Sequence, residues 1–129
     1  MDNRRPRITV VVADDHNVFR RGVVRALNGS EDLEVVGEVG DGHAALRAIR
    51  DLRPTVALLD YRMPGLDGLE VLSAVAGERL PTRVLLLSAF DDDPLARRAL
   101  LQGACGYLNK ESDRSEIVRA VIKCAAGAR

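Results

Sequence analysis

Five residues of the kinds that handle phosphate and metal ions stand at the ends of apolar runs in this sequence. Asp14, Asp15 and Asp60 follow or close such runs, Ser88 closes another, and Lys110 follows a short one. Carboxylates that converge repel one another, which raises at least one pKa unless a cation is present. Carboxylate and backbone oxygens suit Mg²⁺, and a set without histidine or cysteine argues against zinc. The set therefore predicts a magnesium site.

Together these groups have the chemistry of phosphoryl transfer. A carboxylate nucleophile, a divalent ion, a hydroxyl and an ammonium group can receive a phosphoryl group and spread its developing charge. Each residue alone has an ordinary explanation, because strand-end acids often cap the next helix and a serine or lysine there can be a surface group. It is the combination that indicates a phosphate site.

The apolar runs predict five strands that alternate with helices. Continuous aliphatic runs predict strands covered on both faces, and helical spacing of apolar residues predicts a helix after each. Asp15 or a neighbour should cap the first helix, Pro94 should begin the fourth, and Ser112 or Asp113 should cap the last. The predicted strands are residues 8–13, 33–39, 56–60, 83–88 and 105–108, with the second at an edge.

Strict alternation of strand and helix predicts an α/β fold, a doubly wound parallel sheet with helices on both faces. In such sheets, sites lie beyond the carboxyl ends of the strands, near the point where the strand order reverses. The five candidate residues stand at those ends.

Composition and length bound the class of protein. The 129 residues fit one domain, and 19 basic against 19 acidic residues argue against a basic nucleic-acid binder. No apolar run has the length of a membrane span or of a signal peptide's core, so a cytoplasmic location is expected. Cys105 and Cys124 have no metal-binding spacing and are expected to be reduced structural thiols.

Residues 7–127 resemble a response-regulator receiver domain of the CheY-like kind, from two-component systems. The paired acids Asp14-Asp15, then Asp60 with the loop 60–68 (DYRMPGLDG), Ser88 and Lys110 match the family's acid pair, phospho-accepting aspartate, switch hydroxyl and lysine. Segments 13–16 (ADDH) and 106–111 (GYLNKE) are similar to the NarL/FixJ subfamily, which usually carries a C-terminal LuxR-type helix-turn-helix. The resemblance implies a flavodoxin-like (βα)5 fold with strand order 2-1-3-4-5.

The resemblance also implies a mechanism. A sensor histidine kinase or a small phosphodonor would phosphorylate Asp60, with Mg²⁺ held by Asp14, Asp15, Asp60 and the backbone carbonyl of Arg62. The domain would assist its own phosphorylation and dephosphorylation as a signalling domain, not act as an enzyme on other substrates.

A conformational switch would follow phosphorylation. Lys110 would pair with one phosphoryl oxygen, Ser88 would move to bind another, and Tyr107 would turn inward with it. The side chains expected to tune the lifetime of the phosphoryl group are Arg62, Ala89 and Phe90. The surface of the fourth helix, fifth strand and fifth helix, or that of the first and fifth helices, would then control homodimer formation and a transcriptional output.

The resemblance predicts the organisation of the chain as well. Residues 1–6 are expected to be a disordered tail, 7–127 the receiver, and 128–129 the start of a linker to a C-terminal domain that alone would contact DNA. A single-domain receiver is the alternative. No membrane partner is expected.

Other interpretations share part of the pattern. A magnesium phosphohydrolase of the haloacid-dehalogenase type has Asp-x-Asp after its first strand, a flavin or nucleotide binder needs a glycine-rich loop, and a pseudo-receiver that only binds partners needs no complete site. His16 is expected to line the rim and His43 to face solvent, and the acids of residues 91–93 to complement a helix dipole. Glu111 follows Lys110 where many receivers have proline, so whether that peptide is cis stays open.

Overall fold

The computed structural model describes residues 7–89 and 93–127. In this part of the chain the strands are β1 (Ile8–Ala13), β2 (Leu33–Val39), β3 (Val56–Asp60), β4 (Arg83–Ser88) and β5 (Gly106–Asn109). The helices are α1 (Asn17–Asn28), α2 (Gly42–Leu52), α3 (Gly68–Gly77), α4 (Asp93–Leu101) and α5 (Arg114–Ala125). The predicted tail (1–6), the predicted linker (128–129), Phe90 and the acids at 91 and 92 lie outside the described residues.

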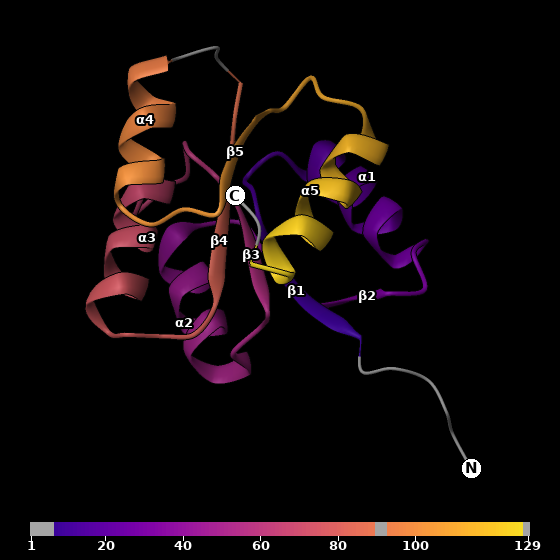
Figure 1. Cartoon of the computed structure of the whole chain (residues 1–129), viewed down its shortest axis with the longest axis horizontal. Coiled ribbons are helices and arrows are strands. Elements are labelled where there is room, and N and C mark those ends of the chain that lie inside the picture. Colours follow the sequence, from indigo (N-terminus) through magenta and orange to yellow (C-terminus); the bar gives the residue numbers. More distant parts are fainter. Residues whose placement is uncertain (1–6, 90–92, 128–129) are drawn as a thin grey trace.

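The strands form one parallel sheet in the order β2-β1-β3-β4-β5 (Figure 1). This order confirms the predicted flavodoxin-like topology, with β2 at an edge. The chain winds outward in opposite directions from β1 and β3, so the strand order reverses between them. The predicted ligand position is therefore beyond the carboxyl ends of β1 and β3.

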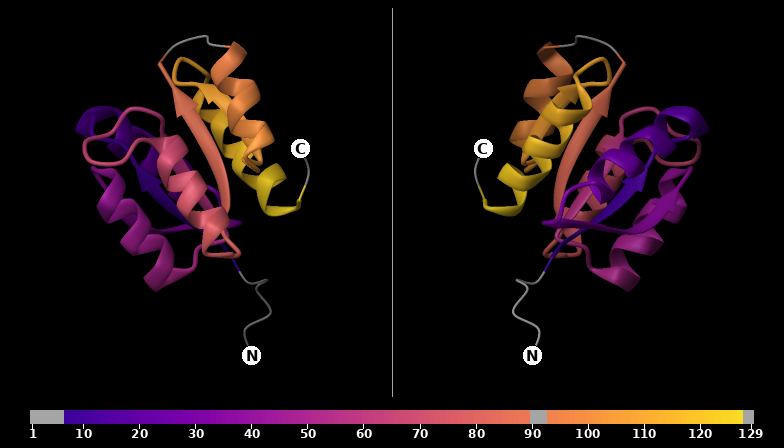
Figure 2. Two further views of the ribbon diagram at one scale, coloured as in Figure 1. Left: turned by 90° about the vertical axis from the view of Figure 1, so that its left-hand side faces the viewer. Right: turned by 90° about the vertical axis from the view of Figure 1, so that its right-hand side faces the viewer.

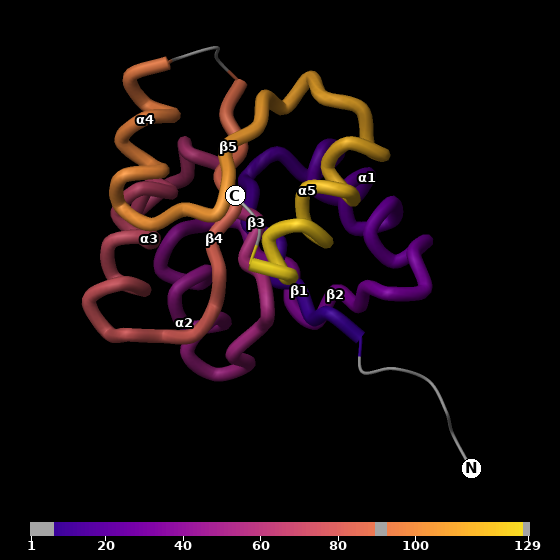
Figure 3. Tube along the Cα trace, viewed as in Figure 1, coloured from indigo at the N-terminus to yellow at the C-terminus, as the bar shows by residue number. Residues whose placement is uncertain are grey.

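Helices cover both faces of the sheet, as the continuous apolar strands predict. α2, α3 and α4 lie on one face and α1 and α5 on the other (Figure 2). Neighbouring residues of one strand serve opposite faces, since Ala57 and Leu59 pack toward α2 and α3 while Val56 and Leu58 pack toward α1 and α5. α1 and α5 lie side by side although they stand at opposite ends of the sequence (Figure 3).

The helix starts show which acids are caps. Asp41 caps α2 by accepting the Ala44 N–H at 2.8 Å, and Asp67 and Glu70 form a capping box at the start of α3. The cap of α1 is His16, whose side chain makes no capping hydrogen bond. Asp113 stands at the predicted cap of α5, also without a side-chain capping bond.

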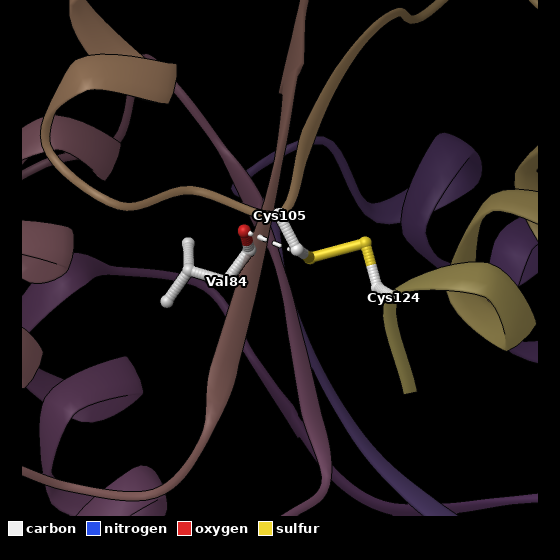
Figure 4. Close-up of a disulfide and its surroundings, with 3 residues drawn as sticks. All are labelled: Val84, Cys105 and Cys124. Carbon is white, nitrogen blue, oxygen red and sulfur yellow. Dashed lines mark hydrogen bonds between the residues drawn. A yellow bond between two sulfur atoms is a disulfide. The ribbon is translucent and has the colours of Figure 1, made fainter. Parts of the chain in front are cut away.

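The prediction that both cysteines are reduced thiols is wrong for this structure. Cys105 and Cys124 form a disulfide that joins the residue before β5 to the last turn of α5 (Figure 4). Both are buried in the core on the α1 and α5 face, with Cα atoms 5.5 Å apart. A separation of 19 residues carries no spacing signal, because only the packing of α5 on the sheet brings the two sulfur atoms together.

Two further expectations concern the backbone and the membrane. Among the described residues every peptide bond is trans, so the Lys110–Glu111 bond is trans as well. Within residues 7–89 and 93–127, no helix combines the length and the apolar character that crossing a membrane requires.

Candidate functional site

The carboxyl ends of β1 and β3 bring two buried acids together. Ala13 pairs with Leu59 across the two strands, so the residues that follow, Asp14 and Asp60, stand side by side. Their exposed fractions are 2% and 3%. Neighbouring buried carboxylates cost free energy unless a positive charge lies close to both.

Lys110 supplies that charge. Its Nζ lies 2.7 Å from Asp14 Oδ2 and 3.1 Å from Asp60 Oδ2. Lys110 follows β5, and its backbone N–H donates to the Ser88 carbonyl at 2.8 Å, which fixes the start of its side chain beyond the end of β4. The structure thus brings Lys110 to both acids, where the sequence predicted that the strand-end residues converge.

The two carboxylate oxygens of Asp14 have different partners. Oδ1 accepts the backbone N–H of His16 at 2.9 Å. Oδ2 is buried and accepts no hydrogen bond of good angular geometry, although Lys110 Nζ is close enough for an ion pair. Charge attraction depends weakly on angle, so Lys110 still pairs with Oδ2, and the second lone pair of this oxygen stays available to a cation.

The environment of Asp60 raises the pKa of its carboxyl group. Burial is the main cause, and the charge of Asp14 acts in the same direction. Hydrogen bonds from Lys110 and from the backbone of Arg62, together with the charge of Lys110, act against this and lower it. The net effect is a buried carboxylate whose charged form is destabilised in the folded protein.

Asp15 and His16 complete the acidic cluster. The side chain of Asp15 is 38% exposed, and its Oδ1 lies 3.3 Å from His16 Nδ1. The same ring nitrogen is 3.2 Å from Asp14 Oδ1 and 3.3 Å from Lys110 Nζ. The prediction that His16 lies at the rim holds for most of its ring, which is 68% exposed, but the premise that no histidine joins the acids is wrong.

The acids are not helix caps, which was the ordinary explanation for them. α1 begins after His16 and α3 is capped by Asp67, so neither Asp14 nor Asp60 fills that role. His43 is exposed on α2, as predicted.

The other predicted site residues surround the cluster. Ser88 is buried as the last residue of β4, one position beyond the Leu87 that pairs with Asp60. Tyr107 is half-buried in β5 and packs toward the face that carries α4. Arg62 and Ala89 are exposed after the ends of β3 and β4, and Arg62 lines a surface hollow together with Asp15 and Asp67 among others.

Two residues without a signal in the sequence support the site. Arg20 on α1 donates from Nη1 to the Asp14 carbonyl at 2.7 Å and from Nε to Glu38 at 2.9 Å, which ties the acidic turn to β2. The ring of Phe19 lies beneath Lys110, with Nζ 4.5 Å from the ring centre, and also contacts the guanidinium group of Arg114. Both stand on α1 directly after the acids, where helical spacing alone assigns Phe19 to the core.

The donor set fits a divalent cation. Oxygens of Asp14, Asp15 and Asp60 and a nitrogen of His16 lie within 4.8 Å of one another, as ligands of one ion must. The buried Asp14 Oδ2 that accepts no hydrogen bond is a second sign that the site has room for positive charge. Hard carboxylate oxygens suit Mg²⁺.

Comparison with known proteins places the chain in a family. The model of the response regulator receiver domain matches residues 10–122. The chain therefore belongs to the response-regulator receiver family, whose members are signalling domains of two-component systems.

Within this family, the chain is similar to regulators of the NarL and LuxR types. Over 128 residues the chain is 56% identical to the "Probable transcriptional regulatory protein NarL" of Mycobacterium tuberculosis, which covers 98% of the chain and 59% of that protein. It is 34% identical over 127 residues to the nitrate/nitrite response regulator NarL of Escherichia coli, covering 98% of the chain and 58% of that protein. The chain thus spans about three fifths of the length of these relatives.

Solved structures agree with this kinship. The signal receiver domain of the "putative response regulator NarL" from Mycobacterium tuberculosis superposes with a TM-score of 0.93 at 56% identity. The match covers 95% of the present chain and 99% of the NarL domain. A DNA-binding response regulator of the LuxR family from Staphylococcus aureus gives 0.87 at 27% identity, covering 92% and 98%.

Proposed function

We propose that this chain is a phosphorylation switch in which Asp60 receives a phosphoryl group from a sensor histidine kinase. The observation that carries the proposal is the contact of Lys110 Nζ with both Asp60 and Asp14 at the carboxyl ends of the central strands. A buried carboxylate held by an ammonium group, beside two further acids, is the arrangement that an acyl phosphate needs to form.

Each residue has a defined part in the transfer. An Asp60 oxygen attacks the phosphorus atom of the donor in line with the bond that breaks, and the donor leaves with the electron pair of that bond. Lys110 is already 3.1 Å from Asp60 Oδ2, so it can follow the new phosphoryl group by pairing with one of its oxygens.

Mg²⁺ would be held by Asp14, Asp15, Asp60 and the backbone carbonyl of Arg62. When bound, the ion supplies charge neutralisation for the oxygens of the transferring group. Asp14 and Asp15 would orient the ion. Arg20 keeps Asp14 in place, because its Nη1 donates a 2.7 Å hydrogen bond to the Asp14 carbonyl.

The signal would leave the site through β4 and β5. Ser88 hydrogen-bonds a phosphoryl oxygen after transfer, and Tyr107 turns inward on the side of α4. Arg62, Ala89 and Phe90 set the access of water to the acyl phosphate and hence its lifetime. Two relatives are named as a transcriptional regulatory protein and as a DNA-binding response regulator, which supports an output in transcription through a further domain.

Homodimer formation is part of the proposal. Phosphorylation would alter either the α1 and α5 surface or the α4, β5 and α5 surface, so that two copies associate. Sedimentation of the chain with and without saturating beryllofluoride and Mg²⁺ tests this, and an unchanged monomer would count against it.

The acceptor itself is tested by phosphorylation in vitro. The chain is incubated with acetyl phosphate and Mg²⁺ and weighed as an intact protein by mass spectrometry. We expect one phosphoryl increment that disappears with a chelator and in Asp60→Asn. The matched control is Asp67→Asn, which removes a carboxylate that caps α3 and lines the neighbouring hollow. It should keep the increment, and an unmodified wild-type protein would overturn the proposal.

A further inference from the structure

His16 is placed to do more than line the rim of the site. Its ring is largely exposed, but Nδ1 lies among the carboxylate oxygens, 3.2 Å from Asp14 Oδ1, 3.3 Å from Asp15 Oδ1 and 3.9 Å from Asp60 Oδ2. The side chain does not cap α1, although His16 occupies the cap position. Its orientation toward the acids is therefore not explained by the helix.

The distances match the edges of one coordination sphere. Ligand atoms about 2.1 Å from an octahedral ion are separated by about 3.0 Å when adjacent and about 4.2 Å when opposite. The separations of Nδ1 from the oxygens of Asp14 and Asp15 are close to the first value, and that from Asp60 lies between the two. One ion can therefore contact the imidazole and the acids together after small side-chain adjustments.

We propose that His16 Nδ1 is a ligand of the divalent ion in this site and makes the site prefer first-row transition ions such as Ni²⁺ over Mg²⁺. The inference rests on the proposed function, because the ion would be held by the same acids. Imidazole nitrogen adds much to the binding of Ni²⁺ or Zn²⁺ and little to that of Mg²⁺, which takes oxygen ligands and water.

Lys110 is compatible with such an ion. Asp14 turns Oδ1 toward His16 and Oδ2 toward Lys110, so one carboxylate can contact the ion with the first oxygen and keep the lysine on the second. His16 then binds with Nδ1 unprotonated, and its proton resides on Nε2. Lys110 Nζ also lies 3.3 Å from His16 Nδ1, so it has to shift away from that nitrogen while it keeps Asp14 Oδ2.

The chain offers a matched control. It contains two histidines, and the second, His43, is exposed on α2 outside the cluster. His16→Asn removes the imidazole while keeping a residue that is favoured at a helix N-cap, so α1 should not be weakened. His43→Asn makes the same chemical change away from the acids.

Pulsed electron paramagnetic resonance with Mn²⁺ bound to the full chain reads the ligand directly. We expect the signature of a coordinated imidazole nitrogen in the wild type and in His43→Asn, and its loss in His16→Asn. Bound Mn²⁺ without nitrogen coupling in the wild type would overturn the inference, and so would coupling that survives in His16→Asn.

Calorimetric titration with Ni²⁺ and with Mg²⁺ measures the preference. His16→Asn should weaken Ni²⁺ binding on the order of tenfold and leave Mg²⁺ binding within about twofold, whereas His43→Asn should change neither. Equal losses for both ions would contradict the inference.

The same preparations separate this inference from the proposed function. Phosphorylation of Asp60 with acetyl phosphate and Mg²⁺, without nitrogen coupling to Mn²⁺, refutes the role of His16 alone. Nitrogen coupling without phosphorylation refutes the acceptor and leaves His16 as a ligand. Failure of the chain to bind Mn²⁺ refutes both.

Discussion

The two ends of the central strands solve the problem of buried polar groups in opposite ways. At the amino ends the groups are neutral and paired: Thr82 donates to the Pro54 carbonyl at 2.7 Å, and Thr9 and Thr55 bond to each other's backbone N–H groups. At the carboxyl ends, Asp14 and Asp60 are buried beside each other and share one lysine. The same strands thus carry satisfied hydrogen bonds at one end and an unresolved charge conflict at the other.

The disulfide also lies near the amino ends of the strands. Cys105 precedes β5 and its Sγ lies 3.2 Å from the Val84 carbonyl near the start of β4, while Cys124 joins it from α5. The difference teaches that the amino ends serve stability, whereas the carboxyl ends give up stability to keep two buried acids beside one lysine.

The largest change is expected when Lys110 is removed. Lys110→Ala leaves two buried carboxylates without their ammonium partner, which should lower the free energy of unfolding by about 3 kcal/mol at neutral pH in the absence of divalent ions. Mg²⁺ should restore part of the loss, because an ion that binds only the folded state stabilises it. Urea denaturation measures both effects.

The control for this change is Lys123→Ala, which removes an exposed lysine from the last turn of α5. It should alter the free energy of unfolding by less than about 0.5 kcal/mol. If Lys110→Ala were as stable as this control, the charge conflict at the carboxyl ends would be absent.

Breaking the disulfide should act on stability and leave the site alone. The bond closes a loop between residues 105 and 124, and the double variant with serine at both positions should lose about 3 kcal/mol of unfolding free energy. Mg²⁺ affinity should stay within about twofold, because the sulfur atoms are remote from the acids. Chemical denaturation and calorimetry give the two numbers, and a large loss of Mg²⁺ affinity would erase the distinction between the two ends.

Asp60→Asn should stabilise the protein at neutral pH without divalent ions. The pKa of Asp60 is raised in the folded state, so the folded protein holds this proton more tightly than the unfolded chain does. Stability is therefore lost as pH rises from the ordinary carboxyl pKa through the raised one, and Asn avoids that loss.

The gain should be present at pH 7 and should vanish near pH 3, where the carboxyl group is largely protonated in both states. Thermal unfolding of both proteins across this range, with a chelator present, measures it. A gain that is independent of pH would show that charge is not its cause.

The smallest effect is expected for a single hydrogen bond at the amino ends, that between Thr82 and Pro54. Thr82→Val keeps the shape of the side chain but removes the donor to the Pro54 carbonyl, at a cost of about 1 kcal/mol at every pH between 4 and 9. The absence of pH dependence is the contrast with Asp60, and denaturation at two pH values suffices to reveal it.

Much of the fold was predictable because it rests on local patterns. The aliphatic runs of β1, β3 and β4 are continuous, and each helix has apolar residues at helical spacing, so strands, helices and class follow from periodicity. Asp60 could be chosen because a charge that closes a buried strand conflicts with its surroundings.

What could not be predicted depends on contacts between distant segments. The Cys105–Cys124 pair forms through the docking of α5, and Phe19 beneath Lys110 through the meeting of α1 with the end of β5. The contact of His16 with the acids could not be predicted, because neighbouring charges set the direction of an exposed ring and sequence periodicity carries no information on it.

The identity of the acceptor is tested most directly by trapping it chemically. The chain is phosphorylated with acetyl phosphate and Mg²⁺ and reduced with borohydride, which converts an aspartyl phosphate to homoserine, and its peptides are then sequenced by mass spectrometry. The account predicts homoserine at position 60 alone, and none when Mg²⁺ is withheld. Homoserine at position 14, 15 or 67 in place of 60, or at no aspartate, would contradict it.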